Sequence, residues 1–581
     1  MLYFIKTLQK KFFKNQKSQK MENDYDSESS DSEDFECDSE EIEDSENSSS
    51  EEESPDEWQK KLLFSNEKTP KLKEDPKLKS KLKWKHPIDS FTEFLSNDIL
   101  ERIKVQSNIY GKSKLKNFQE TTIQEWKYFF CIVITLSLHQ FNGSLVELWS
   151  TKWQTRLDGV ASRFDRNRFM EMKSAFHLVD NSQFSKNERK KNRAYKVKWF
   201  LDYVSEKCFE LRTPPKFLSV DEGTAPYKGS RSVMRQYNPD KPHKYGFKFW
   251  MLCDRSGYVY QMRIYQGAVI DDNGKKIRTV GLAKIVVLDL ISNLPKGYVI
   301  VVDNYYSSIA LAQSLLEKGI YFLGQIKKNA SGLDKNWITL NSKGSKKLKK
   351  GEWDWRMIRN VVSFIWHDTK INVMISNYPD LINSKKNPFS SEIQRKNKQI
   401  IEIRTCPTAA NLYNEQMGGV DLFGSHRGRS PSGFKSKKYW HVLFWYCFDV
   451  VLVCSWLNWK LFQNEDLSFF DFKLQITSKW EPPKFWWRTN APSPVKALTP
   501  KKRKFKEISS IHTPIMADKS IYCTVCLDNQ ELNNNTRKEV PRKRLKCEEC
   551  DTHLCFGNCW KIFHKDNQFY CLEETMESDE N

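Results

Sequence analysis

The chain of 581 residues is long enough for several folded units, since about 150 residues per domain is typical. Residues 22–57 hold 19 of its 74 acidic side chains and no basic one. The rest of the chain carries 94 lysine and arginine residues against 55 acidic residues, a formal net charge of +39. Such a surplus is typical of proteins that bind polyanions, because each neutralised phosphate releases counterions. Nucleic acid is therefore the first partner expected.

The distribution of the 14 cysteines argues against a secreted disulfide framework, because seven lie between Cys523 and Cys571 and the others are scattered singly. The apolar stretch at residues 2–5 is shorter than the core of a signal peptide, about 7–15 residues. Residues 440–459 approach the length of a membrane-spanning helix, but Asp449 lies in their middle, where a charge costs about 3 kcal/mol. We therefore predict a buried helix and no membrane partner.

The N-terminal part of the chain divides into two predicted sections. Residues 1–87 are expected to be disordered, because an acidic serine-rich tract and a lysine-rich linker bury too little apolar surface to offset chain entropy. From 88 to 214 the apolar residues recur at helical spacing, as at Ile123, Trp126 and Phe130. This pattern predicts a helical domain.

After Pro215 the pattern changes to short β-prone runs that predict a mixed α/β sheet. The first part of this core is expected at 215–330, an inserted domain at 331–400 and the last part of the core at 401–462. The expected strands are 217–220, 247–252, 258–265, 298–302, 320–326, 361–366 and 371–376, with helices at 307–318 and 435–461.

A proline-containing linker with some helix is expected at 463–519. Its segment PKKRKFK (500–506) fits a nuclear import signal, which predicts a nuclear location, although an exposed basic linker has the same composition.

Residues 520–575 are rich in soft metal ligands, and zinc is the ion these ligands favour. Eight of them complete two tetrahedral Zn²⁺ sites, and metal binding would supply the folding free energy of so small a segment. Which residues share an ion stays open; a cross-braced pairing, first pair with third and second with fourth, is typical of such modules. The eight ligands are Cys523, Cys526, Cys547, Cys550, His553, Cys555, Cys559 and His564, with Cys571 as a ninth candidate.

Between the two C-x-x-C pairs lie Arg542, Lys543 and Arg544. We expect these residues to contact DNA phosphates, although an ordinary exposed loop has the same composition.

Three aspartates follow apolar runs in the α/β section. Asp221 follows FLSV, Asp303 follows YVIVV, and Asp421 ends GGV ahead of the long helix. Acids at the ends of strands meet at the rim of a sheet, where three of them can hold two Mg²⁺ ions about 4 Å apart. An aspartate after a strand is also a common turn or helix cap, so spacing alone supports this site weakly.

Several ordered motifs strengthen that hypothesis. They are VDEGTAPYKG (220–229), YNPDKPHKYGFKFWMLCD (237–254), VVDNYYSSIALAQSLLEKGIYFLGQIKKN (301–329), YNEQMGGVD (413–421) and RFDRNRFMEMKSAFHLVDN (163–181). Together they resemble the piggyBac transposase family, from about residue 90 to 570.

The resemblance implies a multidomain α/β protein. It has an RNase H-like catalytic core with an inserted domain, a flanking α-helical dimerisation and DNA-binding domain, and a C-terminal zinc-binding cysteine-rich module. It also implies that Asp221, Asp303 and Asp421 are catalytic and bind Mg²⁺ or Mn²⁺.

The reaction that this family resemblance implies is cleavage of double-stranded DNA at the transposon ends. The freed 3′-OH then forms a hairpin, and the opened end joins target DNA at TTAA. A homodimer is expected on the same basis. Lys241, Lys244 and Lys248, together with Tyr237, are expected to contact the DNA backbone, although exposed lysines are the plain alternative.

The chain departs from the family pattern at Gly424, where members often carry a fourth acid, and at HRGRSPSGFKSKKYW (426–440), which is unusually rich in glycine and proline. A domesticated DNA-binding protein without catalysis is therefore an alternative to an active transposase. A RING-type ubiquitin ligase would use only the C-terminal module and leaves the aspartate motifs unexplained.

Overall fold

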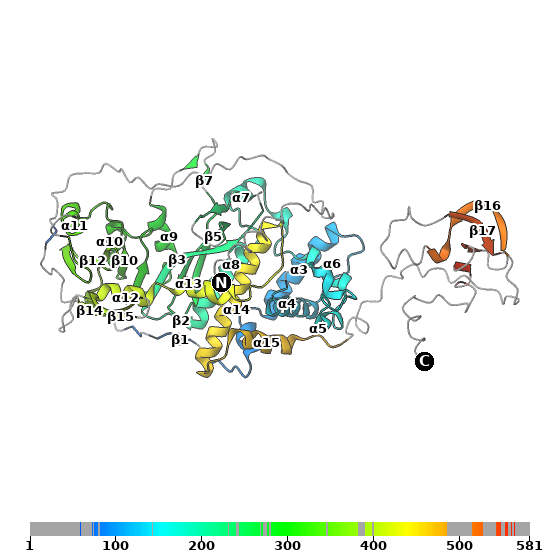
Figure 1. Cartoon of the computed structure of the whole chain (residues 1–581), viewed down its shortest axis with the longest axis horizontal. Coiled ribbons are helices and arrows are strands. Elements are labelled where there is room, and N and C mark those ends of the chain that lie inside the picture. The colour runs from blue at the N-terminus through cyan, green and yellow to red at the C-terminus, as the bar shows by residue number, and fades with distance from the viewer. Residues whose placement is uncertain are drawn as a thin grey trace. The chain divides into compact units, whose positions relative to one another are not determined.

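The computed structural model describes residues 58–59, 72–73, 75–79 and 82–484, apart from short gaps, and parts of the C-terminal segment. The gaps are 142, 230–231, 240–242, 268, 271–275, 278–280, 344–346, 382–389 and 398–399, and the C-terminal parts are 514–526, 542–547, 552–555, 559–560 and 563. The chain forms two compact units, Met1–Asn490 and Ala491–Asn581 (Figure 1). The acidic tract and the segment 500–506 lie outside the described residues.

The section predicted to be helical is helical as far as Leu211, which confirms the periodicity argument. Two of its helices begin at side-chain caps that the sequence displays: Thr122 and Glu125 form a reciprocal capping box at the start of α4, and Asp165 caps α6. The helices are α2 (Pro87–Thr92), α3 (Asn97–Lys114), α4 (Ile123–Leu138), α5 (Asp158–Ala161), α6 (Arg166–Ala175), α7 (Lys186–Lys191) and α8 (Lys198–Leu211).

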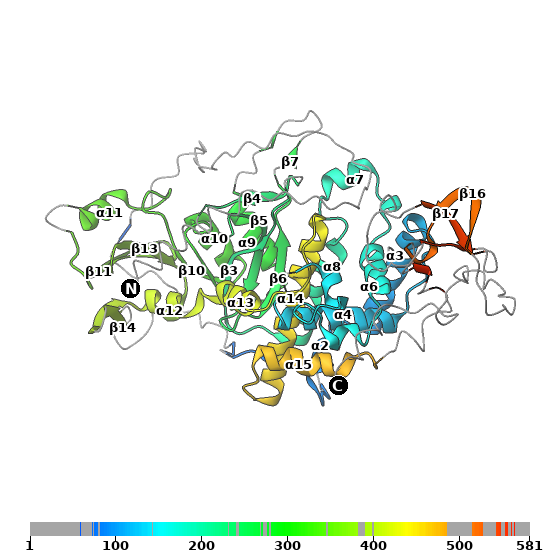
Figure 2. The same cartoon turned by 45° about the vertical axis from the view of Figure 1, so that its right-hand side comes forward.

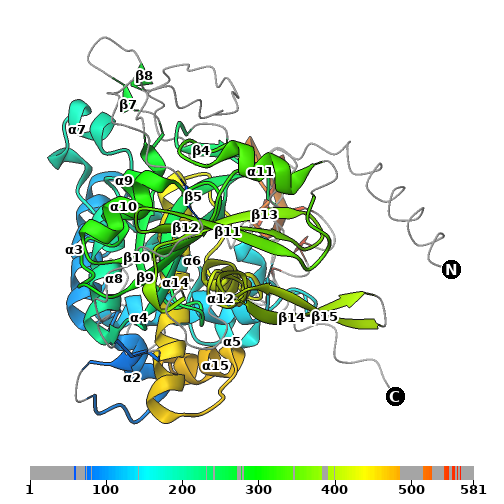
Figure 3. The same ribbon diagram turned by 90° about the vertical axis from the view of Figure 1, so that its left-hand side faces the viewer.

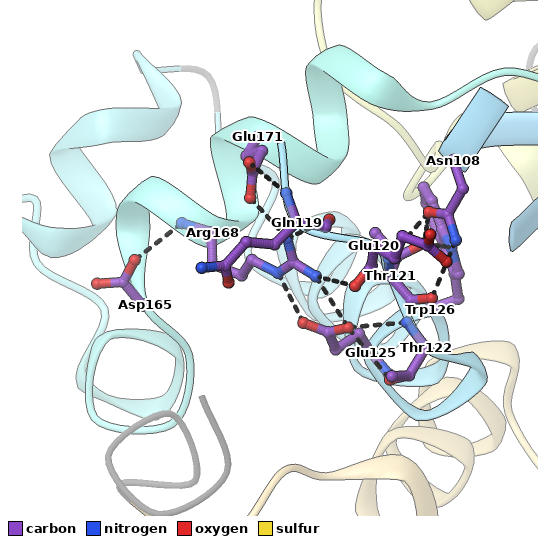
Figure 4. A network of polar contacts seen from close by, with 10 residues as sticks. All are labelled: Asn108, Gln119, Glu120, Thr121, Thr122, Glu125, Trp126, Asp165, Arg168 and Glu171. Atoms are coloured by element: carbon purple, nitrogen blue, oxygen red, sulfur yellow. Dashed lines mark hydrogen bonds and ion pairs between the residues drawn. The ribbon is translucent and has the colours of Figure 1, made fainter. Parts of the chain in front are cut away.

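A mostly buried arginine ties helices α4 and α6 to the link between α3 and α4 (Figure 4). The guanidinium of Arg168 on α6 donates to both carboxylate oxygens of Glu125 on α4, at 2.6 and 3.0 Å, and to Glu171 at 2.6 Å. It also donates to the main-chain oxygens of Gln119 and Glu120, each at 3.0 Å, in the link between α3 and α4. All five N–H donors of the side chain are therefore satisfied.

The centre of the first unit is a mixed nine-stranded sheet, as the sequence pattern predicted. Strand β9 runs parallel to both β3 and β10, and the other pairs along the sheet are antiparallel. The order is β11-β12-β13-β10-β9-β3-β5-β4, with β6 also on β5. The strands are β3 (Phe217–Pro226), β4 (Arg235–Tyr237), β5 (Tyr245–Cys253), β6 (Val259–Ile264), β9 (Val299–Val302), β10 (Tyr321–Gln325), β11 (Trp353–Ile358), β12 (Val361–His367) and β13 (Ile371–Ser376).

Residues 331–400, the expected insertion, contribute β11, β12 and β13 to this same sheet. They also begin a separate antiparallel hairpin, β14 (Ser390–Asn397) with β15 (Ile400–Pro407), which is seen beside α12 (Thr408–Gln416) in Figure 3. The sequence pattern predicted neither β11 nor this hairpin nor α12.

Both faces of the sheet are covered by other parts of the chain. Side chains of a strand alternate between the two faces, so neighbouring residues of one strand belong to different cores. On β9, Ile300 and Val302 belong to the large core that includes the helical section, whereas Val299 and Val301 face a second core that includes Ala409 and Ala410 of α12. The remaining helices are α9 (Leu282–Leu290), α10 (Ile309–Glu317), α13 (Gly419–Gly428), α14 (Tyr439–Gln463) and α15 (Phe469–Trp480).

Helix α14 lies between the helical section and the sheet (Figures 1 and 2). Phe448 stacks on Phe130 of α4 with ring centroids 5.3 Å apart, and Tyr446 stacks on Phe249 of β5 at 4.5 Å. Of its 25 residues 19 are buried, as expected for a helix that is apolar all round. By length and composition α14 is apolar enough to cross a membrane, yet 94% of its apolar window is buried inside the protein, which confirms the predicted buried helix.

The second unit contains a three-stranded antiparallel sheet of β16 (Pro514–Tyr522), β17 (Arg542–Cys547) and β18 (Thr552–His553). Short strand pairs elsewhere are β1 (Lys77–Leu78) with β2 (Arg212–Thr213) and β7 (Val269–Ile270) with β8 (Lys276–Ile277).

Candidate active site and cysteine cluster

Two of the predicted aspartates lie side by side at the middle of the sheet. Val220 of β3 pairs in parallel with Val302 of β9, so the next residues along the two strands are Asp221 and Asp303. Asp303 follows the end of β9, as predicted. Asp221 does not end its strand, which corrects the prediction: β3 runs on to Pro226 because its other neighbour, β5, continues to pair with it.

The carboxylates of this pair lie in a strongly perturbed environment. Burial, followed by the negative charge of Asp303, raises the pKa of Asp221 to about 7. Burial also raises the pKa of Asp303, where the charge of Glu222 adds to the effect and Lys248 opposes it. Main-chain N–H groups of Glu222 and Tyr305 donate to the two aspartates at 2.8 and 2.9 Å and fix their orientation.

Asp421 reaches the site from a helix rather than from a strand end, which corrects the second part of the prediction. It lies exposed in the first turn of α13, a helix that packs against β3, and its charge also raises the pKa of Asp221. The helix can lie this close because Gly419 has no side chain: a Cβ there would stand 2.4 Å from the main-chain oxygen of Asp254 and 2.7 Å from the hydroxyl of Ser219. The GGVD motif therefore supplies both the acid, Asp421, and a glycine that allows α13 to pack closely.

The far end of α13 is fixed to α14. Arg427 forms an ion pair of 2.9 Å with Asp449, whose side chain is 2% exposed, and its guanidinium carbon lies 4.7 Å from the centre of the Tyr446 ring. Asp449 also accepts from the main-chain N–H of Ser432, in the glycine- and proline-containing segment, at 2.9 Å. The central charge of α14 thus anchors the helix that carries Asp421.

Gly424 is exposed on α13, three residues after Asp421. A Cβ at this position meets nothing within 4 Å. The position at which the family resemblance implies a fourth acid is therefore sterically open.

Sequence reasoning missed two neighbours of the aspartate pair. Glu222 accepts from the hydroxyl of Tyr306 at 3.1 Å and forms an ion pair with Lys248. Tyr413 lies close enough for the charges of Asp303 and Asp221, after burial, to raise its pKa. The signals were present, since Glu222 stands in VDEG and Tyr413 opens YNEQMGGVD, but period-2 alternation would have turned Glu222 away from Asp221.

The residues predicted to contact DNA have different environments. The Lys248 ammonium is tied to Glu222 and lies 4.7 Å from the centre of the Tyr305 ring, whereas Lys244 is exposed. In the second unit Arg544 is exposed on β17. Lys241 and the side chains of Arg542 and Lys543 lie outside the described residues.

Four cysteines of the second unit form a compact cluster. The sulfur atoms of Cys523, Cys526, Cys555 and Cys559 all lie within 4.8 Å of one another. The main-chain N–H of Cys555 donates to the sulfur of Cys523 at 3.3 Å. Four converging thiols are the donor set of a tetrahedral structural site.

Of the other predicted ligands, Cys547 ends β17 and His553 ends β18, outside this four-thiol group. Cys550, His564 and Cys571 lie outside the described residues. The cluster therefore joins the first cysteine pair to Cys555 and Cys559.

The comparisons with known proteins agree with this architecture. A family model described as Transposase IS4 matches residues 86–456, more than half of the chain, so the chain belongs to this class of transposases. Human piggyBac transposable element-derived protein 3 is 24% identical over 482 residues, which cover 81% of this chain and 74% of that protein. Human piggyBac transposable element-derived protein 2 is 23% identical over 377 residues, 64% of this chain and 61% of that protein.

Among solved structures, the cryo-EM structure of a piggyBac transposase synaptic complex with hairpin DNA matches with a TM-score of 0.59 and 20% identity, over 82% of this chain and 97% of that one. The family is thus the piggyBac transposase family, as the sequence motifs predicted.

Proposed function

We propose that the protein is a DNA transposase of the piggyBac type. It cleaves DNA at transposon ends, forms hairpin ends and transfers them to TTAA sites, with Asp221, Asp303 and Asp421 as its catalytic carboxylates. The observation that carries the proposal is the convergence of these three acids, from β3, β9 and α13, inside a chain of this transposase family. An RNase H-like core is proposed on the same basis.

The carboxylates suit a hard divalent cation. Oxygen ligands are the ones that Mg²⁺ and Mn²⁺ prefer, and the raised pKa values of Asp221 and Asp303 reflect burial and negative charge for which a cation would compensate. A metal held there would supply activation of the attacking oxygen and stabilisation of the leaving one. The chain's own contribution is to hold the acids in register, by the β3–β9 pairing and the contact of Gly419 with Asp254.

Double-stranded DNA is the proposed substrate. The formal charge of +39 outside the acidic tract supports it, and so does the hairpin DNA in the complex of the structural relative. A homodimer and a nuclear location are proposed from the family resemblance and from residues 500–506.

The C-terminal unit is proposed to hold zinc. The four converging thiols of Cys523, Cys526, Cys555 and Cys559 support one structural site, and a second would use the remaining predicted ligands. Zinc there would contribute folding free energy to a small unit.

A second candidate function is a domesticated DNA-binding protein without cleavage. The observation that favours it is Gly424, because the fourth acid is absent from an exposed and sterically open position on α13. It shares the fold and the cysteine cluster with the first candidate and differs only in the chemistry.

The test is Mg²⁺-dependent cleavage of DNA that carries the element's own ends, taken from the sequence flanking the gene. The full-length protein is compared with Asp303→Asn, with Gly424→Asp, and with Asp466→Asn as a control for the same chemical change at an exposed side chain. We expect hairpin products from the wild type and from Asp466→Asn, and none from Asp303→Asn.

The other results have definite meanings. Cleavage by Gly424→Asp alone would mean a transposase inactivated by loss of the fourth acid. Binding of the transposon ends without cleavage by the wild type or by Gly424→Asp would support the domesticated alternative and contradict the proposed activity.

A further inference from the structure

An exposed aromatic pair lies on the hairpin that β4 forms with β5. Tyr237 and Tyr245 are directly opposite each other in the antiparallel register, with ring centroids 4.9 Å apart. The side chains are 48% and 44% exposed. The guanidinium carbon of Arg235 lies 4.4 Å from the centre of the Tyr245 ring. Two aromatic faces and a cation are therefore presented together to solvent.

A second aromatic pair, between the residue that follows β3 and a residue of β5, serves the fold. Tyr227 stacks on Phe247 with centroids 4.7 Å apart, and these side chains are 4% and 0% exposed. A cross-strand pair stabilises a hairpin by less than about 1 kcal/mol, and burial adds to it. Packing accounts for Tyr227 and Phe247, whereas Tyr237 and Tyr245 remain exposed.

The position of the pair suits a ligand. Among the strands that the structure describes, β4 and β6 are the last on this side of the sheet, each paired with β5. The residues just before Tyr245, His243 and Lys244, are exposed as well. The surface therefore combines aromatic faces with positive charge, the combination on which nucleic acid bases stack while cations contact the backbone.

We propose that Arg235, Tyr237 and Tyr245 form a stacking platform for an unpaired base of DNA, with Lys244 beside the adjacent phosphate. The bases of an intact duplex are stacked on one another and offer no free face, so the ligand is a single-stranded or hairpin segment. The charge of the chain selects a polyanion over an apolar peptide as the occupant.

The platform and the aspartate pair share one strand. Tyr245 precedes Met251, the cross-strand partner of Asp221, by six residues on β5, which is about 20 Å. A DNA strand with the stacked spacing of B-form DNA, roughly 3.4 Å per nucleotide, covers that distance with about six nucleotides. This inference rests on the proposed function in assuming that the aspartates process DNA, and it adds a subsite for the unpaired segment which that reaction produces.

The test measures binding without divalent metal, so that cleavage plays no part in it. The full-length protein is titrated by fluorescence anisotropy with an oligodeoxythymidylate of about 20 nucleotides and with a duplex of the same length. The variants are Tyr237→Ala/Tyr245→Ala and Tyr237→Phe/Tyr245→Phe, which keeps both rings. Phe470→Ala, which removes a 54% exposed ring from α15, is the matched control.

We expect the double alanine variant to lose at least about fivefold in affinity for the single strand, since stacking on aromatic side chains has that magnitude. The phenylalanine variant and Phe470→Ala keep the affinity within about twofold, and duplex affinity changes little in any variant. A 2-aminopurine base at the centre of the oligonucleotide is quenched on binding to wild type and not on binding to the alanine variant.

Two results would overturn the proposal. Unchanged single-strand affinity and quenching in the alanine variant would show that the rings do not contact bases, and an equal loss on single strand and duplex would reduce the surface to a phosphate contact. If the protein never cleaves DNA but the alanine variant loses single-strand affinity as expected, the proposed function is refuted and the platform is kept. If the protein cleaves DNA but the alanine variant keeps its single-strand affinity, the platform alone is refuted.

Discussion

Arg168 offers a quantitative test of how the helical section is held together. Its guanidinium donates to Glu125 twice, to Glu171 once and to the main-chain oxygens of Gln119 and Glu120 (Figure 4). The arginine side chain is 11% exposed and that of Glu125 only 4%. We expect Arg168→Ala and Arg168→Lys to destabilise the protein by different amounts, because they remove different parts of this network.

The alanine variant leaves the Glu125 carboxylate buried without its counter-charge, which costs about 3–5 kcal/mol in the free energy of unfolding. The lysine variant keeps the charge but has at most three donors in place of five. Two acceptors then lose their partners, at about 1–3 kcal/mol for each that is buried. Because the main-chain oxygen of Glu120 bonds at an exposed position, we expect a loss of roughly 1–3 kcal/mol, smaller than that of the alanine variant.

The assay is urea unfolding of the full-length protein. Lys198→Ala, which breaks the exposed α8 pair with Asp202 at 49% and 42% exposure, is the control and is expected within about 0.5 kcal/mol of wild type. A coupling energy of more than about 1 kcal/mol between Arg168→Ala and Glu125→Gln would tie the loss to this pair. If the alanine variant unfolds at the same urea concentration as the control, the network does not stabilise the fold and the reasoning fails.

Three further predictions concern the site and the cluster. Because the pKa of Asp221 is about 7 in the folded protein against 3.8 for an ordinary aspartate, folding loses stability as the pH rises from about 4 to 7. Without added Mg²⁺, Asp221→Asn should remove that loss, so the variant should be more stable than wild type by up to roughly 4 kcal/mol at pH 8 in urea unfolding. A stability difference between variant and wild type that does not vary with pH refutes the burial argument. Gly419→Ala should abolish DNA cleavage while Gly424→Ala, on the open face of the same helix, leaves the wild-type rate, and equal rates would show that close packing of this helix is dispensable. Cys526→Ser should lower the zinc content by one ion per chain, measured by mass spectrometry of the metal, while Thr524→Ala keeps it; unchanged zinc in the serine variant excludes the four-thiol site.

The elements that the sequence predicted well are those whose burial is nearly complete. Residues 299–302 are buried on both faces of the sheet, which produces a continuous apolar run, and α14 is apolar on every side. Patterns of this kind depend on the element alone. Strand β11 was missed because its residues are only partly buried, so that WDWRMI lacks a clean alternation.

The sequence singled out the three acids that the structure brings together, but it did not predict the residues that support them. The reason is physical. The end of β3 is set by the extent of β5, and the partner of Lys248 is set by which side chains of β3 and β5 meet across the pair. Neither the end of β3 nor the partner of Lys248 can be predicted from the residue spacing within one segment. The same limit explains why the ion pair of Lys248 with Glu222 was not predicted, and the contact of Lys248 with DNA stays a prediction.

The two glycines of α13 show how one motif combines packing with chemistry. Gly419 is required by space, since any side chain there would press on the oxygen of Asp254 and move the helix that carries Asp421. Gly424 stands in open space, so packing neither demands the glycine nor forbids an acid. The absence of the fourth acid that the family resemblance implies therefore leaves the packing of α13 unchanged, and it would lower only the negative charge offered to the proposed cation. Whether three acids suffice is a question about metal affinity, and Gly424→Asp addresses it without disturbing the fold.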